Sequence, residues 1–348
     1  MGEKKKGNIV KISVAVLIVA VAVGGFIAFK FYQRFFAPNV TDRETYLYIH
    51  SGWDFEDLIA SMGQLGIVQD TASFRWAAEK MDYPGRVKAG RYKLEPGTNN
   101  RTLINKLGGG FQDPVQLRFA NVRLKENFAA LLASQLEPDS LAFINLLNSD
   151  SVAAKYGFTS QDFFSMFIPN TYEVYWNTSA ESFIDRMATE YNKFWDNGRR
   201  EKAASLNLTP SEVSTLAAIV KGEALHVAEM PTIAGLYINR LHRGMLLQAD
   251  PTVIFAANDF TIRRVLYRHL ALDSPYNTYK YTGLPPGPIM MPSIASIDAV
   301  LNYQKHDYLY MCAKEDFSGY HNFAVTQAEH NINARRFQQA LNERNIKR

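Results

Sequence analysis

One acidic residue interrupts an apolar helical pattern in the segment LAAIVKGEALHV, residues 216–227. The run Thr-Pro-Ser-Glu at 209–212 is typical of a helix start, with a capping threonine, a proline in the first turn and a capping-box glutamate. With about 100° between successive residues, Ile219 and Val220 lie within roughly 60° of Glu223, so Glu223 shares the apolar face. Burial there would raise the pKa of the carboxyl, which suits a general acid working near neutral pH.

Two other roles for Glu223 are weaker. An intrahelical ion pair with Lys221 fails on geometry, because residues two apart on a helix do not face each other. Glu223-x-x-His226 resembles half of a carboxylate–histidine metal site, but the sequence has no second Glu-x-x-His and no His-Glu-x-x-His. We therefore expect no metal ion and no cofactor, and a structural or surface role for His226.

Two polar loops downstream could form a binding surface. The helical segment beginning YINRLHRG is expected to end near Gly244, and a polar turn follows it. The second loop, YNTYKYTGLPPGPIMMPS, has prolines and glycines that fix an irregular backbone. The side chains that we predict to contact substrate are Gln248, Asp250, Asn277, Thr278 and Tyr279.

Asp250 allows two interpretations from the sequence. The simpler one is an Asx turn before Pro251. The other is a second carboxylate working with Glu223, which glycoside hydrolases usually need.

The N-terminus predicts a membrane anchor. Residues 12–29 carry no charge, and Ile9 and Val10 extend this stretch to about the 20 residues that cross a bilayer. The four lysines before residue 12 outweigh Lys30 and Arg34, so residues 1–8 should form a cytoplasmic tail and 9–32 a single-pass anchor. A cleavable signal peptide is the alternative, but no good cleavage site follows the apolar stretch.

The composition indicates a folded, mostly globular chain. It has 348 residues, is 47% hydrophobic and 21% charged, and carries a formal net charge of +4. No basic block with interleaved aromatics occurs, so we expect no binding to nucleic acid. The single cysteine, Cys312, excludes an intrachain disulfide. Stability must therefore come from packing.

Hydrophobic patterning predicts an α+β fold. After a polar linker at 33–45, alternation of strand and helix patterns indicates a small α/β domain at 46–112, an intermediate α/β region at 113–200 and a mixed α/β domain at 201–348. The last of these carries Glu223 and is therefore the expected catalytic domain. The aromatic block at 163–179 could line a sugar groove or pack in the core.

The segments LAAIVKGEA, YINRLHRGMLLQADPTV, YNTY, GLPPGPI, DYLYM and HNFAVTQAEHN, in this order behind an anchor, resemble the endolytic murein transglycosylase family, also called YceG-like. The resemblance covers residues 45–335. It implies a single-pass inner-membrane enzyme with an extracytoplasmic body and a small LysM-like domain, which cuts nascent peptidoglycan strands beside cell-wall synthases. The family's catalytic glutamate, the second of an Ile-Val-Glu-x-Glu segment, corresponds to Glu223, whereas its first glutamate is Lys221 here.

The reaction that the resemblance implies is cleavage of the β-1,4 bond between N-acetylmuramic acid and N-acetylglucosamine, with a 1,6-anhydro ring as product. Glu223 would act first as acid and then as base. Two alternatives stay open: a muramidase-type hydrolase using Glu223 with Asp250, and a non-catalytic peptidoglycan-binding scaffold in which Lys221 and Gly222 mark a decayed site.

Overall fold

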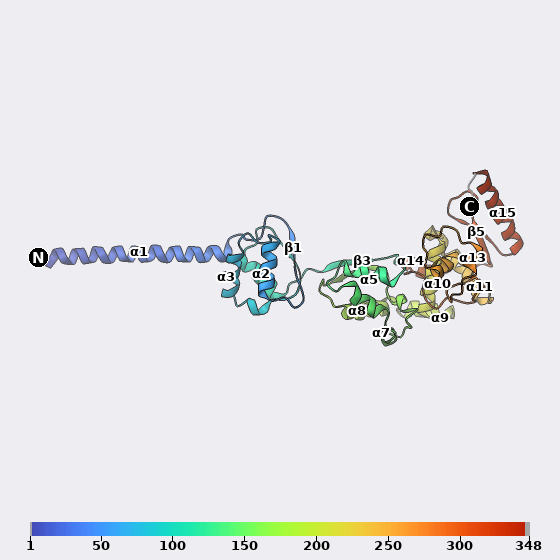
Figure 1. Ribbon diagram of the computed structural model, residues 1–348, viewed down its shortest axis with the longest axis horizontal. Helices are drawn as coiled ribbons and strands as arrows, with labels where there is room; N and C mark the ends of the chain where they lie inside the picture. Colours follow the sequence, from blue (N-terminus) through green and yellow to red (C-terminus); the bar gives the residue numbers. More distant parts are fainter. Residues whose placement is uncertain (1, 345–348) are drawn as a thin grey trace. The chain divides into compact units, whose positions relative to one another are not determined.

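The computed structural model describes residues 2–344, which divide into two units by their internal contacts (Figure 1). The first unit runs to Val115 and includes Glu173–Asn177, and the second comprises Gln116–Tyr172 and the chain from Thr178 onward. The described residues form a mixture of helices and two-stranded sheets, which agrees with the predicted α+β class.

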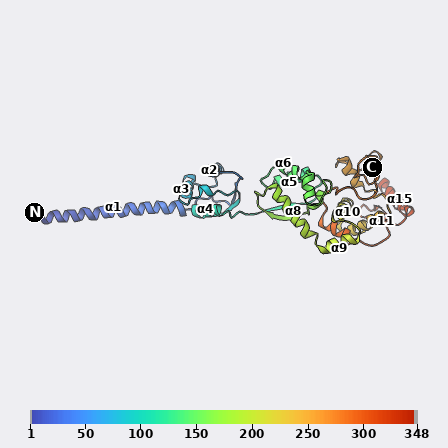
Figure 2. The ribbon, with the colours of Figure 1, turned by 90° about the horizontal axis from the view of Figure 1, so that it is seen from below.

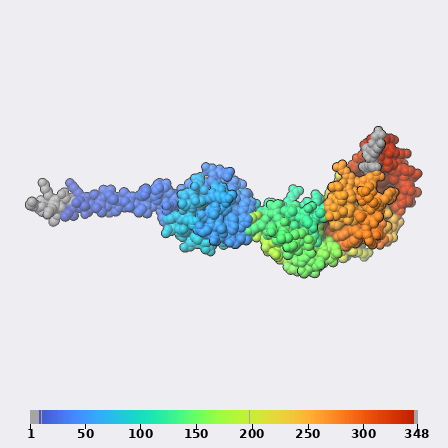
Figure 3. All heavy atoms as spheres, viewed as in Figure 1, coloured from blue at the N-terminus to red at the C-terminus, as the bar shows by residue number. Residues whose placement is uncertain are grey.

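The first helix, α1 (Gly2–Phe36), provides the candidate membrane span. Its segment Lys11–Phe36 has a mean hydropathy of 2.8, and its apolar window is not buried in the protein. The space-filling view shows this helix bare until it reaches the folded part of the first unit (Figure 3). Exposed apolar side chains along a whole helix need a nonaqueous surrounding, which is consistent with the predicted single-pass anchor.

The end of α1 is packed into the first unit. The ring of Phe35 is buried and lies 5.3 Å from the ring of Trp76, centroid to centroid. Val40 is completely buried and forms a bridge with Val68. Residues 33–45, for which the sequence suggested a polar linker, thus include two side chains that the core of the first unit covers.

A two-stranded antiparallel sheet and three helices make up the rest of the first unit. Strand β1 (Thr45–Ile49) pairs with β2 (Gly90–Leu94), and Leu47 lies opposite Tyr92 with both side chains buried. Helix α2 begins with the capping box of Asp54. The helices are α2 (Phe55–Gln64), α3 (Thr71–Lys80) and α4 (Asn100–Gly109), which Figure 2 shows grouped together, and the 3-10 turn η1 (Pro84–Arg86) precedes β2. Helices and strands of this unit share one apolar core.

The second unit begins with short elements around an aromatic core. They are β3 (Val115–Phe119), α5 (Lys125–Ala133), α6 (Ser140–Leu147), α7 (Asp150–Lys155), η2 (Phe163–Met166), β4 (Asn170–Val174), α8 (Ala180–Phe194) and α9 (Asn197–Ser205). Val115 of β3 and the last two residues of β4 are counted with the first unit. Strand β4 pairs with β3. Phe163, Phe164 and Phe167 are buried, and Phe167 contacts the ring of Phe128 at 5.0 Å. The aromatic block therefore contributes mainly to the core.

The remainder of the second unit is arranged around a buried helix, α10 (Pro210–Glu223). Thr209 and Glu212 form the predicted capping box, and every side chain from Val213 to Val220 is buried. Helix α10 packs against three of the elements that follow it, namely α11, α12 and α14. These elements are η3 (Val227–Glu229), α11 (Met230–His242), α12 (Asp250–Ala257), α13 (Tyr267–Leu270), α14 (Ile294–Leu301), β5 (Tyr310–Ala313), β6 (His321–Ala324) and α15 (Gln327–Glu343).

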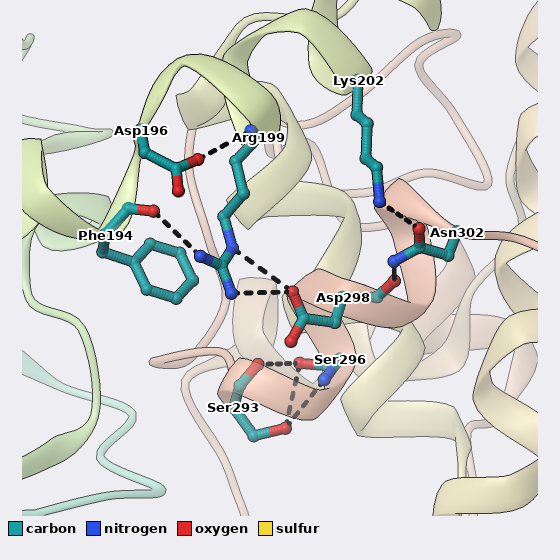
Figure 4. Close-up of polar contacts among 8 residues, drawn as sticks. All are labelled: Phe194, Asp196, Arg199, Lys202, Ser293, Ser296, Asp298 and Asn302. Carbon is teal, nitrogen blue, oxygen red and sulfur yellow. Dashed lines mark hydrogen bonds and ion pairs between the residues drawn. The ribbon is translucent and has the colours of Figure 1, made fainter.

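Polar contacts join α14 and the residue that follows it to α9 (Figure 4). The Arg199 guanidinium contacts Asp298 at 3.3 Å, and the Lys202 ammonium donates a 2.6 Å hydrogen bond to the side chain of Asn302. Such surface contacts contribute at most about 1 kcal/mol each. The buried side chains of Ile297 and neighbouring residues supply most of the packing of α14.

Candidate active site

A pocket of about 220 Å³ lies beside the C-terminal end of α10. Glu223, the last residue of α10, lines it together with residues of α11, of the 247–250 segment, of β5 and of β6. The predicted residues Gln248, Asp250 and Tyr279 line the same pocket. Helices, strands and loop segments that are distant in sequence are thus brought together around one carboxyl group.

The protonation of Glu223 is set by its surroundings. The pKa of Glu223 is raised to about 7, mainly because burial desolvates the carboxyl group and in part because of the negative charge of Asp250. Two groups oppose this effect: the Tyr237 hydroxyl, which donates a 2.9 Å hydrogen bond to Oε1, and the positive charge of Arg240. At neutral pH a large fraction of Glu223 therefore carries a proton, as a general acid must.

Tyr237 and Arg240 are two site residues for which we had made no prediction. They lie three residues apart on α11 and therefore on one face. Arg240, which is 7% exposed, donates hydrogen bonds to the backbone carbonyls of Leu247, at 2.8 Å, and Leu309, at 2.6 Å. This buried cation ties the 247–250 segment and the chain entering β5 to the helix behind Glu223. The feature of the sequence that could have indicated them is their i, i+3 spacing in YINRLH. This spacing is equally compatible with ordinary core packing, so it does not by itself identify site residues.

Gln248 is held in a rarely used backbone conformation. Its φ of +50° lies in the left-handed region, which costs free energy for a residue with a side chain. Two contacts hold it there. The backbone N–H of Gln248 donates a 3.0 Å hydrogen bond to the carbonyl of Thr278, and its side-chain oxygen has a long 3.4 Å contact with Arg240. Its exposed side chain lines the pocket, as expected of a substrate contact.

Asp250 begins a helix rather than the predicted Asx turn. It is the first residue of α12, with Pro251 in the first turn, and no side-chain cap precedes it. Its Oδ1 accepts a 2.6 Å hydrogen bond from the hydroxyl of Tyr279, which keeps the carboxylate at the pocket. A proline suits the first turn of a helix because its missing N–H would have no intrahelical partner there, which explains the difference.

Asn277 and Thr278 lie behind the pocket rather than in its lining. The Asn277 side chain is fully buried and donates to the carbonyls of Leu270 and Leu272. The Thr278 hydroxyl accepts from the amide of Ala249 at 3.0 Å. Direct contact with substrate therefore stays a prediction for Gln248, Asp250 and Tyr279, while Asn277 and Thr278 shape the loops that carry them.

Lys221 and Gly222, the two residues before Glu223, differ from each other in what they contact. Lys221 does not line the pocket. At Gly222 an added Cβ would lie 2.8 Å from Cβ of Pro251 and 3.0 Å from its Cγ. The absence of a side chain at this position lets α10 and the start of α12 approach closely, which places Asp250 near Glu223.

His226 is engaged outside the pocket. Its Nε2 contacts the carbonyl of Ser318 at 2.8 Å, and its ring stacks on Tyr320 at 4.1 Å. Among residues 2–344, no group of three or more His, Cys, Asp or Glu side chains could hold a metal ion.

Comparison with known proteins identifies the family to which this arrangement belongs. The model of the YceG-like family matches residues 47–336. The chain belongs to the YceG-like family. An endolytic murein transglycosylase of Bacillus subtilis is 29% identical over 92% of this chain and 92% of its own length. One of Streptococcus pneumoniae is 27% identical over 92% of this chain, which spans 64% of that longer relative.

A solved structure shares the YceG-like fold. A YceG-like protein of Listeria monocytogenes superposes with a TM-score of 0.55 at 24% identity, covering 83% of this chain and 98% of that protein. This likeness concerns the fold alone.

His321, at the start of the block HNFAVTQAEHN, also lines the pocket of Glu223. Its Nδ1 lies 2.7 Å from the buried carboxylate of Glu229. Nothing near either residue in the sequence indicates this pair, because 92 positions separate them.

Proposed function

We propose that this chain is an endolytic murein transglycosylase. It would cleave the β-1,4 bond between N-acetylmuramic acid and N-acetylglucosamine within peptidoglycan strands and leave 1,6-anhydro ends. The observation that carries the proposal is the Glu223 carboxyl, whose pKa burial raises to about 7, at a pocket in a chain similar over 92% of its length to relatives with that name.

Glu223 acts first as the acid. Its Oε1 accepts the hydrogen bond from Tyr237, so the proton resides on Oε2 and passes to the glycosidic oxygen as the bond to the anomeric carbon breaks. The departing sugar leaves with a new hydroxyl group. The positive charge that develops on the muramyl ring lies beside a carboxylate that has just become anionic, which stabilises it.

Glu223 then acts as the base. Its carboxylate takes the proton from the muramyl 6-hydroxyl while that oxygen bonds to the anomeric carbon, which closes the anhydro ring and restores the acid. The nucleophile belongs to the substrate, so the step consumes no water and needs no second carboxylate. Gln248, Asp250 and Tyr279 then serve as substrate contacts.

A hydrolase is the second candidate, because Asp250 lines the same pocket as Glu223. In that case Asp250 would direct water to the anomeric carbon, and the products would carry reducing ends. The hydrogen bond from Tyr279 to Asp250 favours a positioning role for Asp250 instead.

We propose further that α1 anchors the chain with its N-terminus in the cytoplasm, because the lysines before the apolar stretch outnumber the basic residues after it. The body would then face newly made strands outside the membrane. A LysM-like role of residues 46–112 in strand binding and an association with cell-wall synthases belong to the same proposal.

The experiment is cleavage of purified glycan strands by the full chain in detergent micelles. We expect the parent chain to shorten the strands and Glu223→Gln to be inactive. A matched control is Glu201→Gln, which alters an exposed glutamate on α9 and should keep full activity. Cleavage by Glu223→Gln at the parental rate would overturn the assignment of the catalytic acid.

A further inference from the structure

The His321–Glu229 pair is built from a buried carboxylate whose two oxygens both bind one residue. Glu229 is 6% exposed and lies where η3 meets α11. Its Oε1 accepts the backbone N–H of His321 at 2.8 Å, and its Oε2 lies 2.7 Å from Nδ1 of the same residue. A buried carboxylate costs free energy unless it is well paired, so these two contacts fix the histidine ring firmly.

The pairing determines which ring nitrogen carries the proton. A carboxylate accepts hydrogen bonds, so Nδ1 of His321 is the donor, and Nε2 of the neutral ring presents a lone pair. Nε2 has no hydrogen-bond partner among the described residues. It is also not one of the polar atoms that are buried without a partner in this part of the chain. The side chain is 15% exposed and lines the pocket of Glu223. In the neutral ring the accessible nitrogen is therefore an acceptor at that pocket.

His306, by contrast, uses both of its ring nitrogens within the protein. His306 accepts at Nδ1 from the amide of Tyr308 and contacts the carbonyl of Thr232 through Nε2, at 3.0 and 2.9 Å. A histidine with a purely structural task typically uses its nitrogens in this manner. His321 keeps one nitrogen for a molecule in the pocket.

We propose that His321 is a substrate-binding residue of this pocket, whose Nε2 accepts a hydrogen bond from a hydroxyl or acetamide N–H of a bound N-acetylated sugar. Glu229 is the positioning residue that sets the orientation and tautomer of His321. The inference rests on the proposed function, because peptidoglycan strands supply such donors at every sugar. A neutral acceptor suits them, since these sugar groups carry no positive charge.

Two variants separate this role from a structural one. His321→Asn can place an amide nitrogen where Nδ1 lies, so it keeps the contact with Glu229 but has nothing at the position of Nε2. Glu229→Gln keeps His321, but its amide oxygen must face the backbone N–H. Its amide NH₂ then points at Nδ1, so the ring takes the other tautomer and Nε2 becomes a donor. The matched control is His242→Asn, which alters an exposed histidine at the end of α11.

The test measures the affinity of the full chain in detergent for labelled glycan strands in a Glu223→Gln background, and KM and kcat in the parent background. We expect His321→Asn and Glu229→Gln each to raise Kd and KM about tenfold, the effect of one lost neutral hydrogen bond. The midpoint of thermal unfolding of His321→Asn and the affinity of His242→Asn should match the parent values.

Unchanged strand affinity in both variants would overturn the role of His321. So would a loss of affinity only in step with a lowered unfolding midpoint, because the pair would then act as a structural tether. Cleavage by the parent chain tests the proposed function separately: strands that are bound but not cut would refute the catalytic proposal and leave the contact of His321 measurable.

Discussion

The hydroxyl of Tyr237 donates a 2.9 Å hydrogen bond to Oε1 of Glu223, and the two residues belong to helices that pack against each other. This bond fixes the rotation of the carboxyl group and occupies one of its two oxygens. The other oxygen is the one that can exchange a proton with a molecule in the pocket. The Tyr237–Glu223 bond thus links the packing of α10 and α11 to the direction of proton transfer.

Tyr237→Phe should move the alkaline limit of activity to higher pH. The hydrogen bond from Tyr237 favours the ionised carboxylate and lowers the pKa of Glu223, so its loss raises that pKa. A general acid works while it is protonated, so activity falls as pH rises through its pKa. In this variant the fall therefore begins at a higher pH. The measurement is kcat/KM against pH. A limit that moves to lower pH would contradict the assignment.

Asp250→Asn should move the same limit the other way. The negative charge of Asp250 raises the pKa of Glu223, so its removal lowers that pKa. A transglycosylase should keep most of its cleavage rate below the new limit. If Asp250 were instead the base of a hydrolase, kcat would fall by about 10²–10⁴ at every pH. Tyr279→Phe is the matched control, because it removes the hydrogen bond to Asp250 but keeps the charge.

Gly222→Ala should destabilise the second unit and weaken catalysis. The new Cβ would lie 2.8 Å from Cβ of Pro251, so α12 has to shift and carry Asp250 with it. Overpacking of this kind costs about 1–3 kcal/mol. Gly198→Ala on α9 is the control, since its Cβ would meet only Asp196 at 3.7 Å. Thermal unfolding in detergent should show a lower midpoint for Gly222→Ala and no decrease for Gly198→Ala.

Lys221→Glu should leave cleavage nearly unchanged. This variant introduces a glutamate at the position where the resemblance to the family implies one, but Lys221 does not line the pocket. Surface substitutions usually change free energies by no more than about 0.5 kcal/mol, which corresponds to roughly a twofold change in rate. A gain of a hundredfold or more would show that residue 221 takes part in the reaction.

The sequence was informative where local rules decide the structure. The capping box at Thr209, the burial of the face that Glu223 shares and the exposure of Gln248 all follow from spacing and residue type. Asn277 and Thr278 were predicted as substrate contacts because they occur in a polar loop. In the structure their side chains satisfy backbone groups of neighbouring loops, which local sequence does not reveal.

Contacts between side chains far apart in the sequence could not be predicted from it. The contact between His321 and Glu229 joins residues 92 positions apart, and Arg240 reaches the carbonyl of Leu309 across 69 positions. Phe35 and Val40 lie in a stretch that is polar on average, so their burial in the first unit was equally hidden. Each of these contacts depends on which elements pack together.

The most direct test of the central claim is the chemical nature of the new strand ends. Full chain in detergent is incubated with purified glycan strands, and the products are analysed by mass spectrometry. The account predicts 1,6-anhydro-muramyl ends, one water lighter than reducing ends, formed by the parent chain and by Asp250→Asn and absent with Glu223→Gln. Reducing ends as the main product, or anhydro ends that persist with Glu223→Gln, would contradict it.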